Sequence, residues 1–278
     1  MKILVTGCDG QLGGAVAQEL QSKGHIVIEA NRRNMDLTSR EAVEGQLFRT
    51  RPDAVVHCAA YTNVDRAEEE ASLCRAVNVR GTAYIAEYCR QQDRKLLYVS
   101  TDYVFGRDGG TCHRESAQAS PMNVYGQSKY EGEQIVRTVE RSFIVRTSWL
   151  FGKGGRNFVT AILGKAKRGQ ALQVVDDQIG SPTYAGDLAA LLSDMIQSGE
   201  YGVYHATNEG ECTWYGFAEE ILRLAGIRAG ITPVSADVYG GKAKRPSDSR
   251  LEKGALDRAG FHRLPDWRDA LERYIHNL

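Results

Sequence analysis

The sequence has no excess of charge, no long apolar run and no paired cysteines. Its 35 Lys and Arg residues balance 35 Asp and Glu residues, which argues against a protein that coats nucleic acid or an anionic membrane. No stretch approaches the roughly 18 apolar residues of a membrane span, and the N-terminus lacks a signal-peptide pattern. The six cysteines form no CxxC pair, so disulfides and zinc are not expected. We therefore expect a cytoplasmic protein without a metal, as a monomer or homodimer.

What the sequence does have is glycine, with 29 residues against 6 prolines, and a regular alternation of apolar and amphipathic stretches. The first half predicts strands at 2–5, 26–29, 54–57, 95–99 and 143–146, separated by helices at 12–21, 40–48, 73–89 and 125–139. This alternation is typical of βαβ units and a parallel sheet. Ile3-Leu4-Val5 is continuously apolar, as a strand buried on both faces should be. The predicted fold is α/β, a Rossmann-type doubly wound parallel sheet.

The pattern loosens after about Leu150. Helices are predicted at 157–168, 185–196, 217–225, 249–259 and 267–275, and strands at 173–175 and 203–205. We predict a dinucleotide-binding domain over 1–150, with segments near 174–206 returning to its sheet. Residues 151–278 are predicted to form a smaller, mostly helical substrate-binding lobe.

A glycine-rich turn follows the first predicted strand, with Gly7, Gly10 and Gly13 in the spacing GxxGxxG. Gly7 can turn sharply, Gly10 allows close approach to a pyrophosphate, and Gly13 lets the helix pack on the strand. The helix N-terminus then offers free N–H groups and a positive dipole to an anion. An ordinary glycine-rich turn is the alternative, but the position after the first strand favours a dinucleotide.

The second strand ends without a carboxylate and is followed by Arg32 and Arg33. Arginine at this point accommodates the 2′-phosphate of NADP, so NADPH is weakly preferred over NADH. Exposed loop arginines are the equally simple alternative. Asp36 and Leu37 follow, and we expect either an adenine contact or a turn.

Tyr125 and Lys129 are spaced i, i+4 at the start of a predicted helix, so their side chains share one face. An adjacent ammonium favours the phenolate and should lower the tyrosine pKa toward a catalytic range. Thr101 ends the predicted strand at 95–99, on the sheet edge where ligands bind in open α/β folds. A surface Tyr–Lys pair and a capping threonine are the alternatives.

These motifs, taken together, resemble the extended short-chain dehydrogenase/reductase family over essentially the whole chain. The matching stretches are TGCDGQLG at 6–13, HCAAYT at 57–62, STDYVF at 100–105, YGQSK at 125–129, RTSW at 146–149, DQIGSPT at 177–183 and RPSDS at 245–249. The resemblance is strongest to members that reduce a nucleotide-sugar ketone. It implies that NADPH or NADH reduces the C4 ketone of dTDP-4-dehydro-6-deoxy-L-mannose, giving dTDP-L-rhamnose.

The same resemblance implies a role for each matching residue. Tyr125 would donate the proton, Lys129 would hold the nicotinamide ribose, and Thr101 would bind the reacting oxygen. The sugar–nucleotide contacts would come from Thr101, Asp102, Tyr103, Trp149 and Arg245. The cofactor contacts would come from Gly7, Asp9, Gly10, Gln11, Leu12, Gly13, Arg32, Arg33, Asp36, Leu37, Ala59, Ala60, Tyr61, Thr62, Tyr125 and Lys129. Asn78 matches an architectural asparagine of the family.

Other interpretations remain open. Sugar-nucleotide dehydratases of this family carry an Asp-Glu pair after the threonine, whereas Tyr103 follows Asp102 here, which favours simple reduction. The alternatives are a non-catalytic regulatory subunit resembling that of methionine adenosyltransferase, and a reductase or epimerase of another nucleotide sugar.

Single residues also have alternative interpretations. Trp149 is equally compatible with a core position. The basic loop that contains Arg245 is otherwise a solvated loop, and His57 is expected to be a buried structural histidine.

Overall fold

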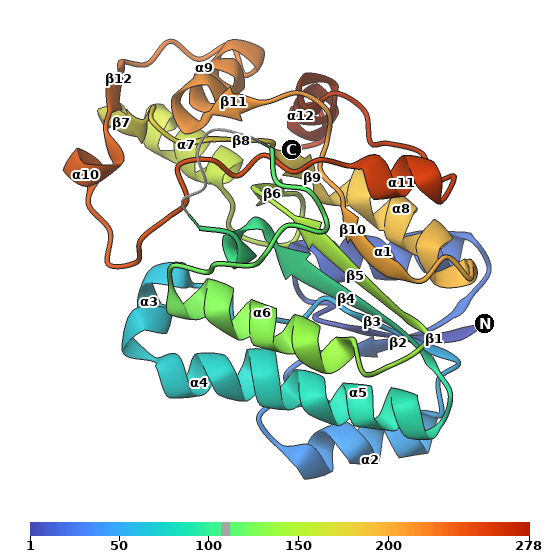
Figure 1. Ribbon diagram of the computed structural model, residues 1–278. Helices are drawn as coiled ribbons and strands as arrows, with labels where there is room; N and C mark the ends of the chain where they lie inside the picture. Colours follow the sequence, from blue (N-terminus) through green and yellow to red (C-terminus); the bar gives the residue numbers. More distant parts are fainter. Residues whose placement is uncertain (107–111) are drawn as a thin grey trace.

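The core of the protein is a six-stranded, all-parallel sheet with the strand order β10-β5-β4-β3-β1-β2 (Figure 1). The computed structural model describes residues 1–106 and 112–278. The strands of the sheet are β1 (Lys2–Thr6), β2 (Ile26–Ala30), β3 (Ala54–His57), β4 (Lys95–Thr101), β5 (Ser142–Thr147) and β10 (Gly202–His205). The chain order reverses between β1 and β3, which is the switch point where ligands bind in such folds.

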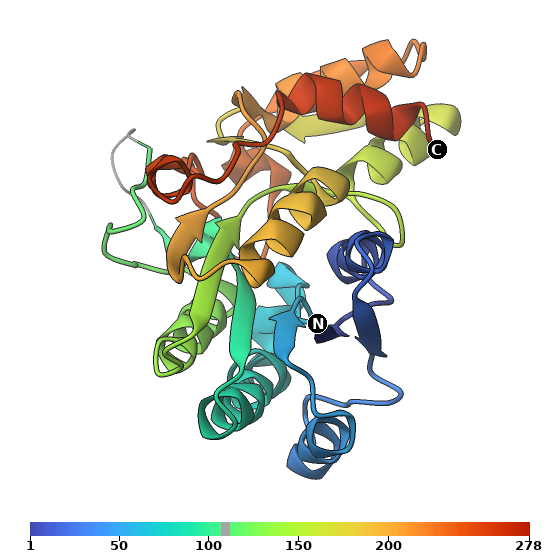
Figure 2. The ribbon, with the colours of Figure 1, turned by 90° about the vertical axis from the view of Figure 1, so that its right-hand side faces the viewer.

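Alternate residues of each strand enter hydrophobic layers on opposite faces of the sheet. Ile3 and Val5 pack with α1 (Gln11–Ser22) and α8 (Ala185–Gln197). Leu4, between them, packs on the other face, which is covered by α2 (Arg40–Thr50), α5 (Thr82–Gln91) and α6 (Val124–Val136). Figure 2 shows the sheet between these two helical layers. The period of two in a strand therefore explains the doubly wound architecture.

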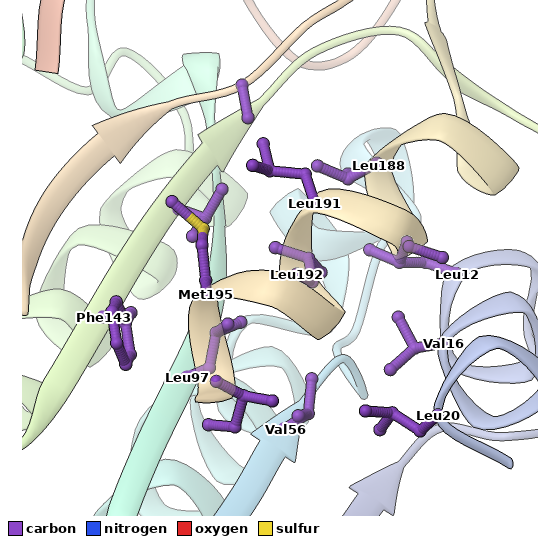
Figure 3. Packing of buried hydrophobic residues seen from close by; sticks show 14 of the residues in the cluster. Leu12, Val16, Leu20, Val56, Leu97, Phe143, Leu188, Leu191, Leu192 and Met195 are labelled. Atoms are coloured by element: carbon purple, nitrogen blue, oxygen red, sulfur yellow. The ribbon is translucent and has the colours of Figure 1, made fainter. Parts of the chain in front are cut away.

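The contact between α1 and α8 covers one face of the sheet with aliphatic side chains. Figure 3 shows Val16 and Leu20 of α1 near Leu192 of α8, with Val56 and Leu97 of the strands beneath them. All five are fully buried. Helix α8 comes from the second half of the sequence, so this packing and the pairing of β10 with β5 tie that half to the main sheet.

The helix predicted over 73–89 is interrupted. It consists of α4 (Ala71–Arg75), a π-helical segment η1 (Ala76–Gly81) and α5, and is preceded by the short α3 (Val64–Glu69). Such π-helical segments are rare and occur frequently at functional sites. Here the wider turn carries Asn78, whose amide reaches the backbone of Tyr61.

The second lobe has its own hydrophobic cluster, centred on Phe151, Phe217, Trp267 and Tyr274. Helices α7 (Phe158–Lys167), α9 (Trp214–Leu224) and α12 (Trp267–Ile275) form this cluster. Helix α10 (Ala236–Tyr239) lies beside Leu172–Val175, and α11 (Gly254–Arg258) packs on the main sheet through Leu256. Short two-stranded ladders connect them: β6 (Leu150–Phe151) with β9 (Thr183–Tyr184), β8 (Ile179–Gly180) with β11 (Cys212–Thr213), and β7 (Leu172–Val175) with β12 (Ile231–Val234).

Two local predictions in this lobe need correction. The helix expected over 249–259 covers only Gly254–Arg258. Ser249 instead donates its backbone N–H to Ile179, at 2.8 Å, and Leu251 forms a bridge with His113. These pairings with Ile179 and His113, which are distant in sequence, keep the segment extended. The strand β12 was not predicted, and it places β7 in a separate ladder outside the main sheet.

Candidate functional site

A cleft of about 770 Å³ follows the carboxyl ends of β1, β3 and β4. It is lined by the glycine loop, by the residues after β2 and β3, and by the residues at the end of β4 and the start of α6. Parallel strands bring these separate loops to one edge of the sheet. The cleft is therefore where the sequence motifs come together.

The glycine loop is built so tightly that side chains would not fit. Gly7 has φ +72°, and a Cβ there would lie 3.0 Å from the Cα of Ala59. A Cβ on Gly13 would lie 2.2 Å from the carbonyl oxygen of Gly7. Helix α1 begins at Gln11 with no side-chain cap at its N-terminus. The first N–H groups of α1 thus face the cleft without a side-chain acceptor, an arrangement suited to a pyrophosphate.

Most of the predicted cofactor contacts line this cleft. They are Gly7, Asp9, Gly10, Gln11, Leu12, Gly13, Arg32, Asp36, Leu37, Ala59, Ala60, Tyr61, Thr62, Tyr125 and Lys129. Arg33, two residues after Asn31, is the exception and does not line the cleft. Met35 and Thr38 line it and were not predicted. No motif marks these two, because their position depends on how the loop after β2 folds back.

Polar side chains behind the cleft hold its wall in place. The Asn78 amide accepts a hydrogen bond from the Tyr61 N–H at 2.8 Å and donates to the Ser128 hydroxyl at 2.9 Å. His57 lies between the hydroxyls of Thr6 and Thr82, at 2.8 and 3.1 Å. Burial lowers the pKa of His57 to about 3, so the ring is neutral. Both side chains are buried and hydrogen-bonded within the protein.

Thr101, Tyr125 and Lys129 all line the same part of the cleft. Thr101 is the last residue of β4, and Tyr125 is the second residue of α6. Asn123 caps α6 by accepting from the Gly126 N–H at 2.7 Å, which fixes the orientation of Tyr125. The Lys129 ammonium lies 3.9 Å from the centre of the Tyr98 ring.

The electrostatics of this group differ from the expectation. Burial raises the pKa of Tyr125, and the Thr101 hydroxyl, rather than Lys129, is the main opposing influence. Burial also lowers the pKa of Lys129 to about 7, against the attraction of Glu133. The predicted lowering of the tyrosine pKa by the ammonium is therefore wrong for this arrangement, because both groups are desolvated. Tyr125 is therefore a protonated phenol at neutral pH.

Trp149 has the left-handed backbone conformation, with φ +47°. Its indole stacks on Trp214 with the ring centres 3.6 Å apart. Gly180 also packs against the indole, since a Cβ there would lie 2.7 Å from Cε2 of Trp149. Strained backbone that the surroundings hold in place is common at ligand sites. Both tryptophans line the cleft, and Trp214 was not found by sequence reasoning because no motif surrounds it.

A second cavity of about 720 Å³ adjoins the cleft and is lined by α7, β7, α10 and the basic loop. Tyr103, Phe158 and Trp214 line both spaces. Arg245 lines only the second one, where Lys165 and Lys244 add positive charge. The Arg245 guanidinium also forms an ion pair with Asp65 at 2.6 Å. The structure thus places Arg245 outside the cleft that Thr101, Asp102 and Trp149 line, while Tyr103 lines both spaces.

Residues 1–106 and 112–278 contain no group of three or more His, Cys, Asp or Glu side chains arranged to hold a metal ion. Within the same ranges, no helix combines the length and apolar character needed to cross a membrane.

A doubly wound parallel sheet, a glycine loop at its switch point and a Thr–Tyr–Lys group at the same edge define the class of nucleotide-binding, short-chain dehydrogenase/reductase-type proteins. Comparison with known proteins narrows this class. The model of the RmlD substrate binding domain family matches residues 1–278, and the chain belongs to this family. The predicted fold class and the extended-family resemblance are confirmed.

Several relatives cover nearly the whole chain. It is 40% identical to the dTDP-4-dehydrorhamnose reductase of Streptomyces griseus, over 96% of this chain and 91% of the relative. It is 39% identical to the spore coat polysaccharide biosynthesis protein SpsK of Bacillus subtilis, over 99% of this chain and 96% of the relative. The crystal structure of the dTDP-4-dehydrorhamnose reductase of Bacillus anthracis in complex with NADP matches with a TM-score of 0.96 and 38% identity, covering 100% of this chain and 99% of that one.

Proposed function

We propose that this protein is an NAD(P)H-dependent reductase that converts dTDP-4-dehydrorhamnose to dTDP-L-rhamnose, a sugar donor for cell-envelope polysaccharide. The observation that carries the proposal is the convergence of Thr101, Tyr125 and Lys129 on one cleft that adjoins a second, basic cavity. The names of the full-length relatives supply the substrate. Relatives named for the reduction of other dTDP-linked ketosugars keep the reaction class and change only the sugar.

The cleft fits a nicotinamide dinucleotide. Gly7 and Gly13 leave no room for side chains where the backbone must approach the pyrophosphate, and the N-terminus of α1 faces the same space. When bound, the reduced nicotinamide supplies the hydride. Arg32 lines the cleft beyond β2 and offers a guanidinium to a 2′-phosphate, so we propose a preference for NADPH.

The protein's own groups place the ketone and provide the proton. Tyr125 donates its phenolic proton to the C4 oxygen, since its raised pKa keeps it protonated. Thr101 orients that oxygen, and Lys129 binds the ribose beside it. Trp149 forms the wall on which the sugar rests, and Trp214 supports it from behind.

The second cavity suits the nucleoside diphosphate of the substrate. Lys165, Lys244 and Arg245 provide cations for the phosphates, while Phe158 and Trp214 provide apolar walls for the base. Because Tyr103 and Trp214 line both cavities, one molecule can place its sugar at Tyr125 and its diphosphate near Arg245.

The test is the absorbance of NADPH during incubation with dTDP-4-dehydrorhamnose. We expect ketosugar-dependent oxidation by the wild type and a fall in kcat of about a hundredfold or more in Tyr125→Phe, which lacks the proton donor. Tyr130→Phe, on the same helix, is the control and should stay within about twofold of the wild type. No oxidation by the wild type, or full activity in Tyr125→Phe, would contradict the proposal and favour a non-catalytic role.

A further inference from the structure

We propose that Asp102 is a positioning residue whose protonation decides whether the hydroxyl hydrogen of Thr101 points to the carboxylate or to the reacting ketone oxygen. The inference rests on the proposed function in one respect, which is that Thr101 faces the ketone. Asp102 then has a second role, the orientation of the Thr101 hydroxyl, in addition to its predicted contact with the sugar.

The Thr101 hydroxyl has three neighbours, which are the Asp102 carboxyl group, the Tyr103 N–H and the Tyr125 hydroxyl. The Thr101 hydroxyl donates to Oδ1 of Asp102 at 2.9 Å, and its oxygen accepts from the Tyr103 N–H at 3.2 Å. A hydroxyl has one hydrogen and two lone pairs. While the hydrogen lies on Asp102, Thr101 presents only a lone pair to any further partner, and a ketone oxygen cannot donate to it.

When Asp102 is protonated, the Thr101 hydrogen can point to the ketone oxygen without movement of any heavy atom. A neutral carboxyl group donates its own hydrogen to the Thr101 oxygen across the same 2.9 Å contact. That oxygen then accepts from Asp102 and from the Tyr103 N–H, which uses both lone pairs, and its hydrogen becomes free for the ketone. Thr101 and Tyr125 can then both donate to the C4 oxygen, which accepts two hydrogen bonds.

The surroundings of Asp102 make both protonation states accessible. The side chain is only 3% exposed, and among the described residues it forms no ion pair within 4.0 Å. Its second oxygen, Oδ2, is buried without a hydrogen-bond partner, and the Ser249 hydroxyl is the polar group that most favours the charged form of the carboxyl group. Burial raises the pKa of Asp102 to about 6, against the Ser249 and Thr101 hydroxyls.

The titratable groups that face Asp102 do not replace it in this role. Tyr125 approaches from α6, and Tyr103 follows Asp102 in the chain; burial keeps both phenols protonated at neutral pH by raising their pKa values. The Arg245 guanidinium lies against Tyr103 and not against Asp102. Ser249, from the segment before α11, is uncharged.

Lys129 also titrates in this part of the cleft, since burial lowers its pKa to about 7, but its ammonium lies over the Tyr98 ring. Its titration is present in the wild type and in Asp102→Asn alike, so a comparison of the two isolates the charge of Asp102.

The first experiment is the pH dependence of kcat with saturating NADPH and ketosugar. In the wild type, kcat should fall about tenfold per pH unit above the pKa of Asp102 in the bound enzyme. In Asp102→Asn this fall should disappear, because an amide N–H donates to the Thr101 oxygen at every pH. Asp102→Leu removes the acceptor that holds the Thr101 hydrogen, so the fall should be absent in this variant too. A fall that persists unchanged in Asp102→Asn would overturn the proposal.

A double-mutant comparison separates action through Thr101 from a merely structural effect. In a Thr101→Val background, Asp102→Asn should no longer alter the pH profile, since the hydroxyl that it orients is gone. An equal effect of Asp102→Asn in both backgrounds would contradict the proposal. The NADPH dissociation constant and the melting temperature of each variant establish that it is folded.

A measurement that needs no turnover distinguishes failure of this inference from failure of the proposed function. The carboxyl infrared band of Asp102, identified by its loss in Asp102→Asn, is followed against pH in the NADPH-bound enzyme. We expect a protonated carboxyl near pH 6 and a higher pKa in Thr101→Val, where the stabilising hydroxyl is absent. Titration near the ordinary aspartate pKa of about 4 would overturn the proposal even for an enzyme with a different ketone substrate.

Discussion

The two adjoining cavities are built by different means. One end of the cleft is formed by backbone, because the glycine loop and the ends of β3 and β4 lie at one sheet edge and leave no space for a Cβ at Gly7 or Gly13. The second cavity is formed by side chains from α7, β7, α10 and the loop before Arg245. A backbone cradle tolerates little change in shape, whereas a wall of side chains can adjust. The cleft should therefore be the more sensitive to a single added methyl group.

The largest effect is expected for Gly13→Ala, in the backbone cradle. The new methyl would lie 2.2 Å from the Gly7 carbonyl oxygen, so α1 must move away from β1. We expect the dissociation constant for NADPH to rise about a hundredfold and the free energy of unfolding to fall by about 1–3 kcal/mol. Calorimetric titration and urea unfolding measure these two quantities.

Gly45→Ala is the matched control for this substitution. Gly45 lies within α2 with nothing near the position of a Cβ, so alanine there should stabilise the protein by up to about 1 kcal/mol and leave NADPH binding unchanged. Equal effects of the two substitutions would show that the tight loop does not matter.

An intermediate effect is expected for Arg245→Ala, in the cavity of side chains. Loss of one cation for the diphosphate should raise the KM for the nucleotide sugar about ten- to a hundredfold, with a smaller change in kcat. Lys242→Ala is the control. Lys242 lies in the same loop as Arg245 and pairs with Glu69 of α3, but it does not line the cavity. The KM is measured by steady-state kinetics. If the KM of both variants stays within about twofold of the wild-type value, Arg245 does not bind the substrate.

The smallest effect is expected at the exposed end of the cleft. Arg32 lines it and Arg33 does not, so Arg32→Ala should raise the dissociation constant for NADPH about fivefold and leave that for NADH nearly unchanged. Arg33→Ala should alter neither. Fluorescence titration with the two cofactors measures the difference, and equal responses of the two variants would show that neither arginine reads the 2′-phosphate.

The sequence predicted those parts of the site whose function depends on local spacing. Gly7, Gly10 and Gly13 were identified because their positions follow directly from the turn between a strand and a helix. Tyr125 and Lys129 were identified because an i, i+4 spacing places them on one helical face. The direction of the Tyr125 pKa shift was missed, since it depends on burial by residues far away in the chain.

The features that the sequence did not reveal are contacts between distant segments. Trp214 stacks on Trp149 across 65 positions of sequence only because β8 pairs with β11 next to them. The extended course of Ser249 and Leu251 results from their pairing with Ile179 and His113, although their local pattern suggested a helix. Tertiary contacts of this kind override local preference.

The sequence by itself determined the doubly wound sheet, the glycine loop and the catalytic candidates, because periodicity and short spacings act within a few turns of chain. Only the tertiary structure decided that Arg245 belongs to a separate cavity and that Asp102 is buried without a counter-ion beside Thr101. Burial and charge depend on which distant segments exclude water, and no local pattern records that.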